Sequence, residues 1–349
     1  LVAIEVDLLD VLHDLFVRCH VAEAQVAVVL RQRQQMLGNA FAVAGGEGRL
    51  YRIAPEGGEP VLLGTHEPGL LSVAWQPKGE LLATAGQDGG VRLWKSVDGA
   101  MQVVHRGRGW PAGLAWRNDG QRLAFAAGRS LQVLDADGQP QLVLDAHTVN
   151  LTHLAWRGRD EIVAAGNGAL YVDRIAGTGQ IEQFLLEGTP QTLALSPDLK
   201  IVANGLADGT VNFRFLNVNR RSRMSGYEGK VDQTAWSANS RLLATSSSGA
   251  GSIVVWDFSG KGPEGSQPLQ LEAHEERIES LAWQPGGPHM VSASRDWKLV
   301  LWKPGPGTRR PLDVQRLQGT PALARWSPDG KLLAVAESGG RISCYALRA

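Results

Sequence analysis

Residues able to do chemistry are scattered along this chain rather than grouped. The eight histidines lie far apart, and four aspartates that precede a glycine each fit a turn: Asp88, Asp119, Asp208 and Asp329. The only cysteines are Cys19 and Cys344, and their separation predicts neither a zinc site nor a disulfide framework. We therefore expect no enzymatic activity, no cofactor and no bound metal.

Glycine-rich segments of the kind that hold a phosphate are also missing. Gly260–Gly262 lacks the upstream glycine and the following Ser or Thr of a phosphate loop. Gly177–Gln180 is too short for a dinucleotide-binding fingerprint. Neither segment predicts a nucleotide site.

A short apolar motif that ends in Trp, or in a residue that replaces Trp, occurs seven times along the chain. This repeat indicates the fold that positions the scattered polar side chains. The copies read LSVAW (71–75), AGLAW (112–116), THLAW (152–156), QTLAL (191–195), DQTAW (232–236), ESLAW (279–283) and ALARW (322–326). Successive copies are 41, 40, 39, 41, 47 and 43 residues apart. A period of about 40–45 residues with strand-like content indicates propeller blades of four strands.

Each repeat divides into four predicted strands. The apolar motif predicts an innermost strand that is buried on both faces. A turn with Pro or Gly and a second strand follow, as in Leu81–Gly86, and the third strand often ends in Trp, as in Val91–Trp94. The fourth strand is polar, for example Arg221–Gly226, as expected of an outer edge.

These units resemble WD repeats over roughly residues 39–349. The resemblance implies a structural hydrogen-bonded tetrad in two repeats. Its members are His66, Thr84, Asp88 and Trp94 in one repeat, and His274, Ser292, Asp296 and Trp302 in the other. In such a set the hydroxyl accepts from the buried indole N–H and bonds to the imidazole, whose tautomer the carboxylate fixes. Elsewhere the pattern is incomplete: Ala164 follows His147 at the hydroxyl position, and no His precedes Thr245 and Trp256.

The fold class is therefore predicted to be all-β, a propeller of WD-type blades. Residues 40–63 match the second to fourth strands of a repeat, and the C-terminus ends after a third strand, Arg341–Leu347. Together with six complete repeats this gives eight nominal blades, with seven as the alternative. We expect the first and last strands to close the ring in one blade.

Residues 1–38 are predicted to form a short N-terminal extension, separate from the propeller at 39–349. Leu8, Val11, Leu12, Leu15 and Phe16 have helical spacing. Ala24–Leu30 is rich enough in β-branched residues to form a strand, which could complete a blade.

The loops between fourth and first strands, and between second and third strands, are the usual docking surface of the family that the repeats resemble. Trp110 and Trp297 fall in such loops beside Arg108 and Arg295, and Tyr227 falls in an equivalent loop. Trp, Tyr and Arg are enriched in binding hot spots, so these five residues are the candidate partner-binding set. The alternative is that each Trp caps its own blade.

Charge and composition restrict the partner and the location. Lys plus Arg equals Asp plus Glu, 35 each, so no overall charge attracts nucleic acid or a membrane surface. No stretch approaches the ~18 consecutive apolar residues of a membrane span. The two lone cysteines fit a reducing compartment, so we expect a cytoplasmic location, and we also expect a monomer. The excess of Arg over Lys suggests a bacterial source.

These observations lead to one function and one alternative. The first is a non-catalytic scaffold that binds a protein or peptide through its loop face. The alternative is a small-molecule-binding or hydrolytic propeller that uses the central channel, for which acids or histidines from several blades should point inward.

Overall fold

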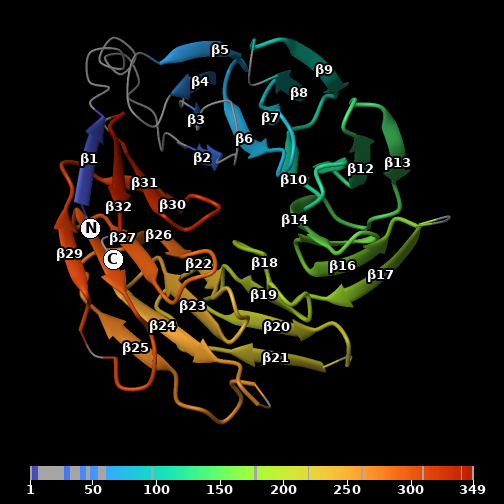
Figure 1. The fold of residues 1–349 in the computed structure, drawn as a ribbon. Coiled ribbons are helices and arrows are strands. Elements are labelled where there is room, and N and C mark those ends of the chain that lie inside the picture. Colours follow the sequence, from blue (N-terminus) through green and yellow to red (C-terminus); the bar gives the residue numbers. More distant parts are fainter. Residues whose placement is uncertain are drawn as a thin grey trace.

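The chain folds into a ring of eight four-stranded antiparallel sheets, as the computed structural model shows (Figure 1). The structure describes residues 2–6, 27–31, 40–44, 48–53, 60–95, 98–176, 179–218, 220–260, 262–308, 310–338 and 340–347. All regular elements among these residues are strands. The predicted all-β propeller with eight blades is confirmed.

The blades are numbered here in chain order, and the first four contain only consecutive strands. Blade 1 contains β2 (Ala27–Arg31), β3 (Ala40–Ala44), β4 (Arg49–Ile53) and β5 (Val61–Thr65). Blade 2 contains β6 (Leu70–Trp75), β7 (Leu81–Gly86), β8 (Gly90–Lys95) and β9 (Met101–Arg106). Blade 3 contains β10 (Pro111–Trp116), β11 (Arg122–Ala127), β12 (Ser130–Asp135) and β13 (Pro140–Leu144). Blade 4 contains β14 (Leu151–Arg157), β15 (Glu161–Gly166), β16 (Ala169–Arg174) and β17 (Gln180–Leu185).

The second half continues the pattern until the last blade, which takes one strand from the other end of the chain. Blade 5 contains β18 (Ala194–Leu195), β19 (Ile201–Gly205), β20 (Val211–Phe215) and β21 (Arg220–Met224). Blade 6 contains β22 (Val231–Trp236), β23 (Leu242–Ser247), β24 (Ser252–Asp257) and β25 (Leu269–Glu272). Blade 7 contains β26 (Ile278–Trp283), β27 (Met290–Ser294), β28 (Lys298–Trp302) and β29 (Asp313–Arg316). Blade 8 contains β30 (Pro321–Trp326), β31 (Leu332–Glu337), β32 (Ile342–Ala346) and β1 (Val2–Val6).

The ring closes through blade 8, where β1 is the outer strand beside β32 and Ile4 is paired with Cys344. Both ends of the chain thus share one sheet, which removes two free edges. In blade 1, β2 is the inner strand, as expected for the segment 24–30. The predicted boundary at residue 38 therefore does not separate β1 and β2 from the propeller sheets. The predicted helix at residues 8–16 lies outside the described residues.

The tryptophan at the end of the inner strand joins five of the blades to the blade before them through a carbonyl oxygen of an Ala. The indole Nε1 of Trp116 donates to the carbonyl oxygen of Ala74 in the previous blade at 3.0 Å, and Trp156 donates to Ala115 at 3.0 Å. Trp236, Trp283 and Trp326 repeat this bond with Ala194, Ala235 and Ala282. The small Ala side chain lets neighbouring blades approach each other closely, and the hydrogen bond gives the buried indole N–H an acceptor that it would otherwise lack. This geometry explains why the motif recurs about once per blade.

Candidate docking face

One face of the ring carries every predicted partner-binding residue. It is formed by the connections from outer to next inner strand and by the turns between second and third strands; we call it the loop face. Trp110 and Arg108 lie between β9 and β10, Tyr227 lies between β21 and β22, and Arg295 and Trp297 lie between β27 and β28. Their side chains nevertheless differ in burial and in hydrogen bonding: some are exposed and others are bonded inside a blade.

In blade 2 the four tetrad residues form a continuous hydrogen-bonded chain. Trp94 Nε1 donates to Thr84 Oγ1 at 2.7 Å, and the Thr84 hydroxyl donates to His66 Nε2 at 2.8 Å. His66 Nδ1 then donates to Asp88 Oδ1 at 2.9 Å. Burial lowers the pKa of His66 below its usual range. A neutral imidazole is the form that fits this chain, because Nε2 must accept while Nδ1 donates.

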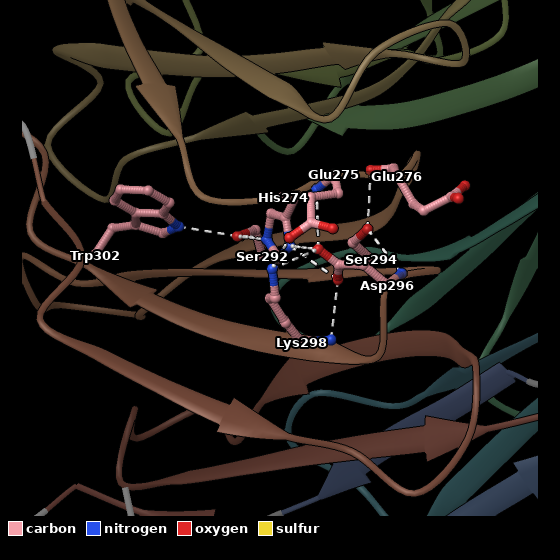
Figure 2. A network of polar contacts seen from close by, with 8 residues as sticks. All are labelled: His274, Glu275, Glu276, Ser292, Ser294, Asp296, Lys298 and Trp302. Carbon is pink, nitrogen blue, oxygen red and sulfur yellow. Dashed lines mark hydrogen bonds and ion pairs between the residues drawn. The ribbon is translucent and has the colours of Figure 1, made fainter.

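Blade 7 has the same chain, which Figure 2 shows together with the polar residues around it. Trp302 Nε1 donates to Ser292 Oγ at 2.8 Å, and Ser292 bonds to His274 Nε2 at 2.7 Å. His274 Nδ1 lies 3.2 Å from each carboxylate oxygen of Asp296. The backbone N–H groups of Glu275 and Lys298 also donate to Asp296. Because Glu275 and Asp296 lie in two loops of the loop face, the tetrad holds these loops together.

Tyr227 is part of the blade interior and not of a free binding surface. Its hydroxyl lies 2.6 Å from Thr245 Oγ1 and accepts from Trp256 Nε1 at 2.8 Å. Burial raises its pKa. Tyr227 lies four residues before Val231, the first residue of the inner strand β22, just as His66 lies four residues before Leu70. Tyr227 therefore replaces the tetrad histidine, a role that was not predicted because no His precedes Thr245 and Trp256.

Blade 4 keeps only the His and uses it differently. The side chains of His147 and Asp173 are both fully buried, and His147 Nε2 lies 3.0 Å from Asp173 Oδ2. Strand pairing puts Asp173 opposite Ile162, the place that Trp94 has opposite Leu82 in blade 2. Although burial alone lowers it, the hydrogen bond and charge of Asp173 raise the pKa of His147 on balance. Blade 4 thus holds a buried His147–Asp173 hydrogen bond in place of the tetrad, and this contact is an ion pair when His147 is protonated.

Trp110 and Arg108 remain solvent-exposed on the loop face. Trp110 is 62 % exposed, the largest exposed fraction among the described tryptophans. Arg108 is also exposed and forms no ion pair with any residue that the structure describes. These two side chains therefore stay available to a partner.

Trp297 is both partly packed and strained. It is 42 % exposed, and its Nε1 donates to Thr320 Oγ1 in the next loop at 3.2 Å. Its φ of 63° is in the left-handed region, where the equivalent turn of blade 2 has Gly89 with φ 73°. Bulky side chains rarely adopt this conformation. Arg295 is held by the carboxylate of Glu279 on β26.

The charged side chains on or next to the inner strands of blades 6 and 7 are paired with each other. Asp232 on β22 accepts from Arg277 Nη2 at 2.7 Å, and Glu279 on β26 lies 3.7 Å from Arg277. Burial raises the pKa of Asp232 although Arg277 opposes the shift. His153 on β14 hydrogen-bonds to the Gln191 carbonyl oxygen at 3.1 Å. Within the described part of the chain, no group of three metal-ligating side chains occurs.

A groove on the opposite face was not predicted from the sequence. It lies between blades 6 and 7 and has a volume of about 490 Å³. Its walls come from the long connections after β24 and β28, including Pro268, Pro304 and Pro306. Since proline and glycine dominate these connections, the sequence alone predicts only loops here.

Three segments match the family described as WD domain, G-beta repeat, at residues 60–95, 219–257 and 265–303. Each runs from an outer strand, through the next blade, to a third strand that ends at or next to a tryptophan: Trp94, Trp256 or Trp302. The chain is thus similar to WD-repeat proteins. The blades outside these segments are those in which the Trp has been replaced, or is absent.

Whole-chain comparisons agree with this. The chain is 22 % identical over 280 residues to the SIR4-interacting protein SIF2 of Saccharomyces cerevisiae, which covers 79 % of this chain and 46 % of SIF2. It is 21 % identical to the protein hir1 of Schizosaccharomyces pombe over 81 % of this chain and 26 % of hir1. The chain therefore spans less than half of either relative. Both are eukaryotic and give no support to the bacterial source suggested by composition.

Among solved structures, the computationally designed Ika8 protein superposes with a TM-score of 0.72 at 21 % identity. The match covers 93 % of this chain and 97 % of Ika8. At this identity the likeness concerns the fold alone. Among the described residues, no helix is long and apolar enough to cross a lipid bilayer.

Proposed function

We propose that this chain is a non-catalytic WD-repeat propeller that binds protein partners through its loop face, with Trp110 and Trp297 as the anchors. The observation that carries the proposal is the distribution of tryptophan. Nine of the eleven tryptophans are at most 9 % exposed, and all nine lie on strands. The two exposed ones both lie in loops of the loop face. A large apolar side chain left in water favours burial against a partner.

The backbone at Trp297 supports the same interpretation. A left-handed conformation costs a residue with a side chain of the order of 1–2 kcal/mol, and glycine adopts it readily. Blades 2 and 5 have Gly89 and Gly209 at the equivalent place, with φ of 73° and 77°. A Trp that is kept there against this cost points to a function of the side chain.

The relatives support an interaction role in general terms. SIF2 is named for its interaction with another protein, SIR4. The channel alternative receives less support, because Asp232 and Glu279 are both engaged with Arg277 in the channel wall. Paired charges of this kind hold blades together without offering a free catalytic acid or base.

The test is an affinity pull-down with the full chain and a Trp110→Ala/Trp297→Ala double variant as baits. The matched control is Leu312→Ala, which removes an exposed apolar side chain (56 % exposed) from a loop on the opposite face. We expect a partner that the wild type and the Leu312→Ala variant capture equally and that the double variant loses. Equal capture by all three baits would contradict the proposal.

A further inference from the structure

We propose that the loop face of blade 3 binds an acidic peptide segment, whose carboxylates pair with Arg106, Arg108 and Arg129 and whose apolar side chain packs on Trp110. This inference rests on the proposed docking function and names the chemistry of a partner for one sector of the loop face.

Strand pairing brings the four residues together from two loops. The connection from β9 to β10 runs from Arg106 through Arg108 to Trp110. Pro111 is paired with Ala127, so Trp110 lies opposite the short turn that contains Arg129. All four side chains are exposed. Their placement depends on pairing between β10 and β11, because Arg129 is 19 residues beyond Trp110 in the sequence.

Blade 3 lacks the polar clamp that joins the two loops of blades 2 and 7. The backbone of its Arg129 turn is held instead from blade 4, where His147 Nδ1 donates to the Arg129 carbonyl oxygen at 2.9 Å. Gly107 replaces the tetrad histidine, since it lies four residues before the inner strand as His66 does in blade 2. Phe125 and Leu134 stand at the hydroxyl and tryptophan places. Arg129 stands in the turn that holds Asp88 in blade 2. No imidazole–carboxylate pair therefore joins these two loops to each other, and the side chains of Arg108, Trp110 and Arg129 are exposed.

In blade 3 an aromatic contact inside the sheet takes the place of the hydrogen-bonded tetrad beneath the loop from β9 to β10. The rings of His105 on β9 and Phe125 on β11 meet edge to face, with centroids 5.0 Å apart. The burial of His105 lowers its pKa, which favours the neutral ring. The positive charge of the patch thus comes from the three arginines alone.

These arginines differ from several other cations of the loop face in having no acidic partner among the described residues. Arg92 pairs with Asp88, Arg277 with Asp232, and Lys298 with Glu275. The segments 106–110 and 128–129 contain three arginines and no acid. Because the chain has no net charge overall, this sector is a local positive field. Carboxylates are its natural complement, and arginine binds them bidentately.

The size of the patch favours a peptide over nucleic acid. Single-stranded nucleic acid is bound by an extended basic groove with several stacking aromatic residues. Here one aromatic residue stands among three arginines, and the neighbouring loops contain Glu67 and Asp145. A phosphate backbone that continued past the patch would meet those acids. A short acidic segment with one apolar side chain fits without such repulsion.

The test is fluorescence anisotropy with the full chain and a short fluorescein-labelled peptide that carries Glu on both sides of one Leu. A peptide with Gln in place of each Glu is the charge control. Arg108→Glu and Trp110→Ala are the test variants. The matched control is Arg310→Glu, which reverses an exposed arginine in a loop of the opposite face. Melting temperatures of all variants report on folding.

We expect the Glu peptide to bind the wild type and to bind more weakly as salt increases. The Gln peptide and both test variants should each lose about tenfold or more in affinity, since loss of a hot-spot side chain costs at least that much. Arg310→Glu should change affinity by less than about twofold. Absent binding, or an equal loss with Arg310→Glu, would overturn the inference.

Two further outcomes are decisive. If a labelled single-stranded oligonucleotide binds more tightly than the Glu peptide and loses affinity with Arg108→Glu, the patch is a nucleic-acid site and the inference is wrong. If the Glu peptide fails to bind while the pull-down still loses a partner with Trp297→Ala, the docking function stands and only this inference fails.

Discussion

The left-handed backbone at Trp297 predicts the reverse of the usual order of stability between alanine and glycine variants. We expect Trp297→Gly to be more stable than Trp297→Ala. Both variants lose the same packing and the bond from Nε1 to Thr320, so their difference isolates the backbone. With φ at 63°, alanine keeps a left-handed cost of about 1–2 kcal/mol that glycine avoids. The greater conformational freedom of glycine in the unfolded chain reduces this stability advantage by about 0.4–1 kcal/mol. The net advantage of glycine should therefore lie between about 0 and 1.6 kcal/mol, with a midpoint near 0.8 kcal/mol.

The measurement is urea unfolding of both variants, followed by tryptophan fluorescence and by circular dichroism, with a common slope. Trp110 provides the matched control, because it is also an exposed loop tryptophan but is not among the residues with positive φ. At Trp110 the usual order should hold, and the Ala variant should be more stable than the Gly variant by about 0.4–1 kcal/mol. If alanine is at least as stable as glycine at position 297, the left-handed conformation is not present and the argument for a functional Trp there fails.

Three further predictions concern the blade interiors. Trp302→Ala should cost about 3–5 kcal/mol, because the side chain is fully buried and its N–H is bonded to Ser292; a neutral result in urea unfolding would contradict the tetrad. Tyr227→Phe should lower the free energy of unfolding by about 1–3 kcal/mol, because it leaves the Trp256 N–H without its acceptor. The same variant should capture partners as the wild type does. Loss of a partner at unchanged stability would instead show that Tyr227 is a binding residue. Because the pKa of His147 is raised above 6.5, its stabilisation is complete below that pH and is lost as pH rises through the raised value. The stability advantage of the wild type over Asp173→Asn should therefore shrink above pH 6.5 in urea unfolding, and an advantage that grows with pH would refute the ion pair.

The repeat pattern predicted the blades because every inner strand solves the same packing problem. In five blades a Trp at the end of the inner strand donates to an Ala carbonyl oxygen of the blade before it, so the motif can be recognised even where other residues of the repeat change. The outer strand β1 was not predicted as a strand, because it contributes no such Ala–Trp pair; in the structure it is paired with β32 in blade 8. Sequence patterns detect side-chain periodicity, whereas ring closure depends on which distant edges meet.

The docking face was predicted only in part, for a similar reason. Trp110 and Trp297 could be assigned to loops from their places in the repeat, and they are exposed there. Tyr227 was assigned to the same surface, but its hydroxyl bonds inside blade 6. A count of four residues back from the inner strand would have identified it as the substitute for histidine. Arg129 could not be linked to Trp110 without the pairing of β10 with β11.

Loss of the clamp and gain of the arginine patch in blade 3 are physically connected. In blade 7 the carboxylate of Asp296 accepts from His274 and from the Glu275 amide, so the acid is consumed in fixing two loops. Blade 3 has no such acid to bury, and Arg129 in its turn points its charge to solvent. The rings of Phe125 and His105 pack against each other where blade 2 has its hydrogen-bonded tetrad, so blade 3 needs no buried acid at that place. A blade that lacks the polar clamp can therefore present exposed arginines at the same two loops, as the proposed acidic-peptide site requires.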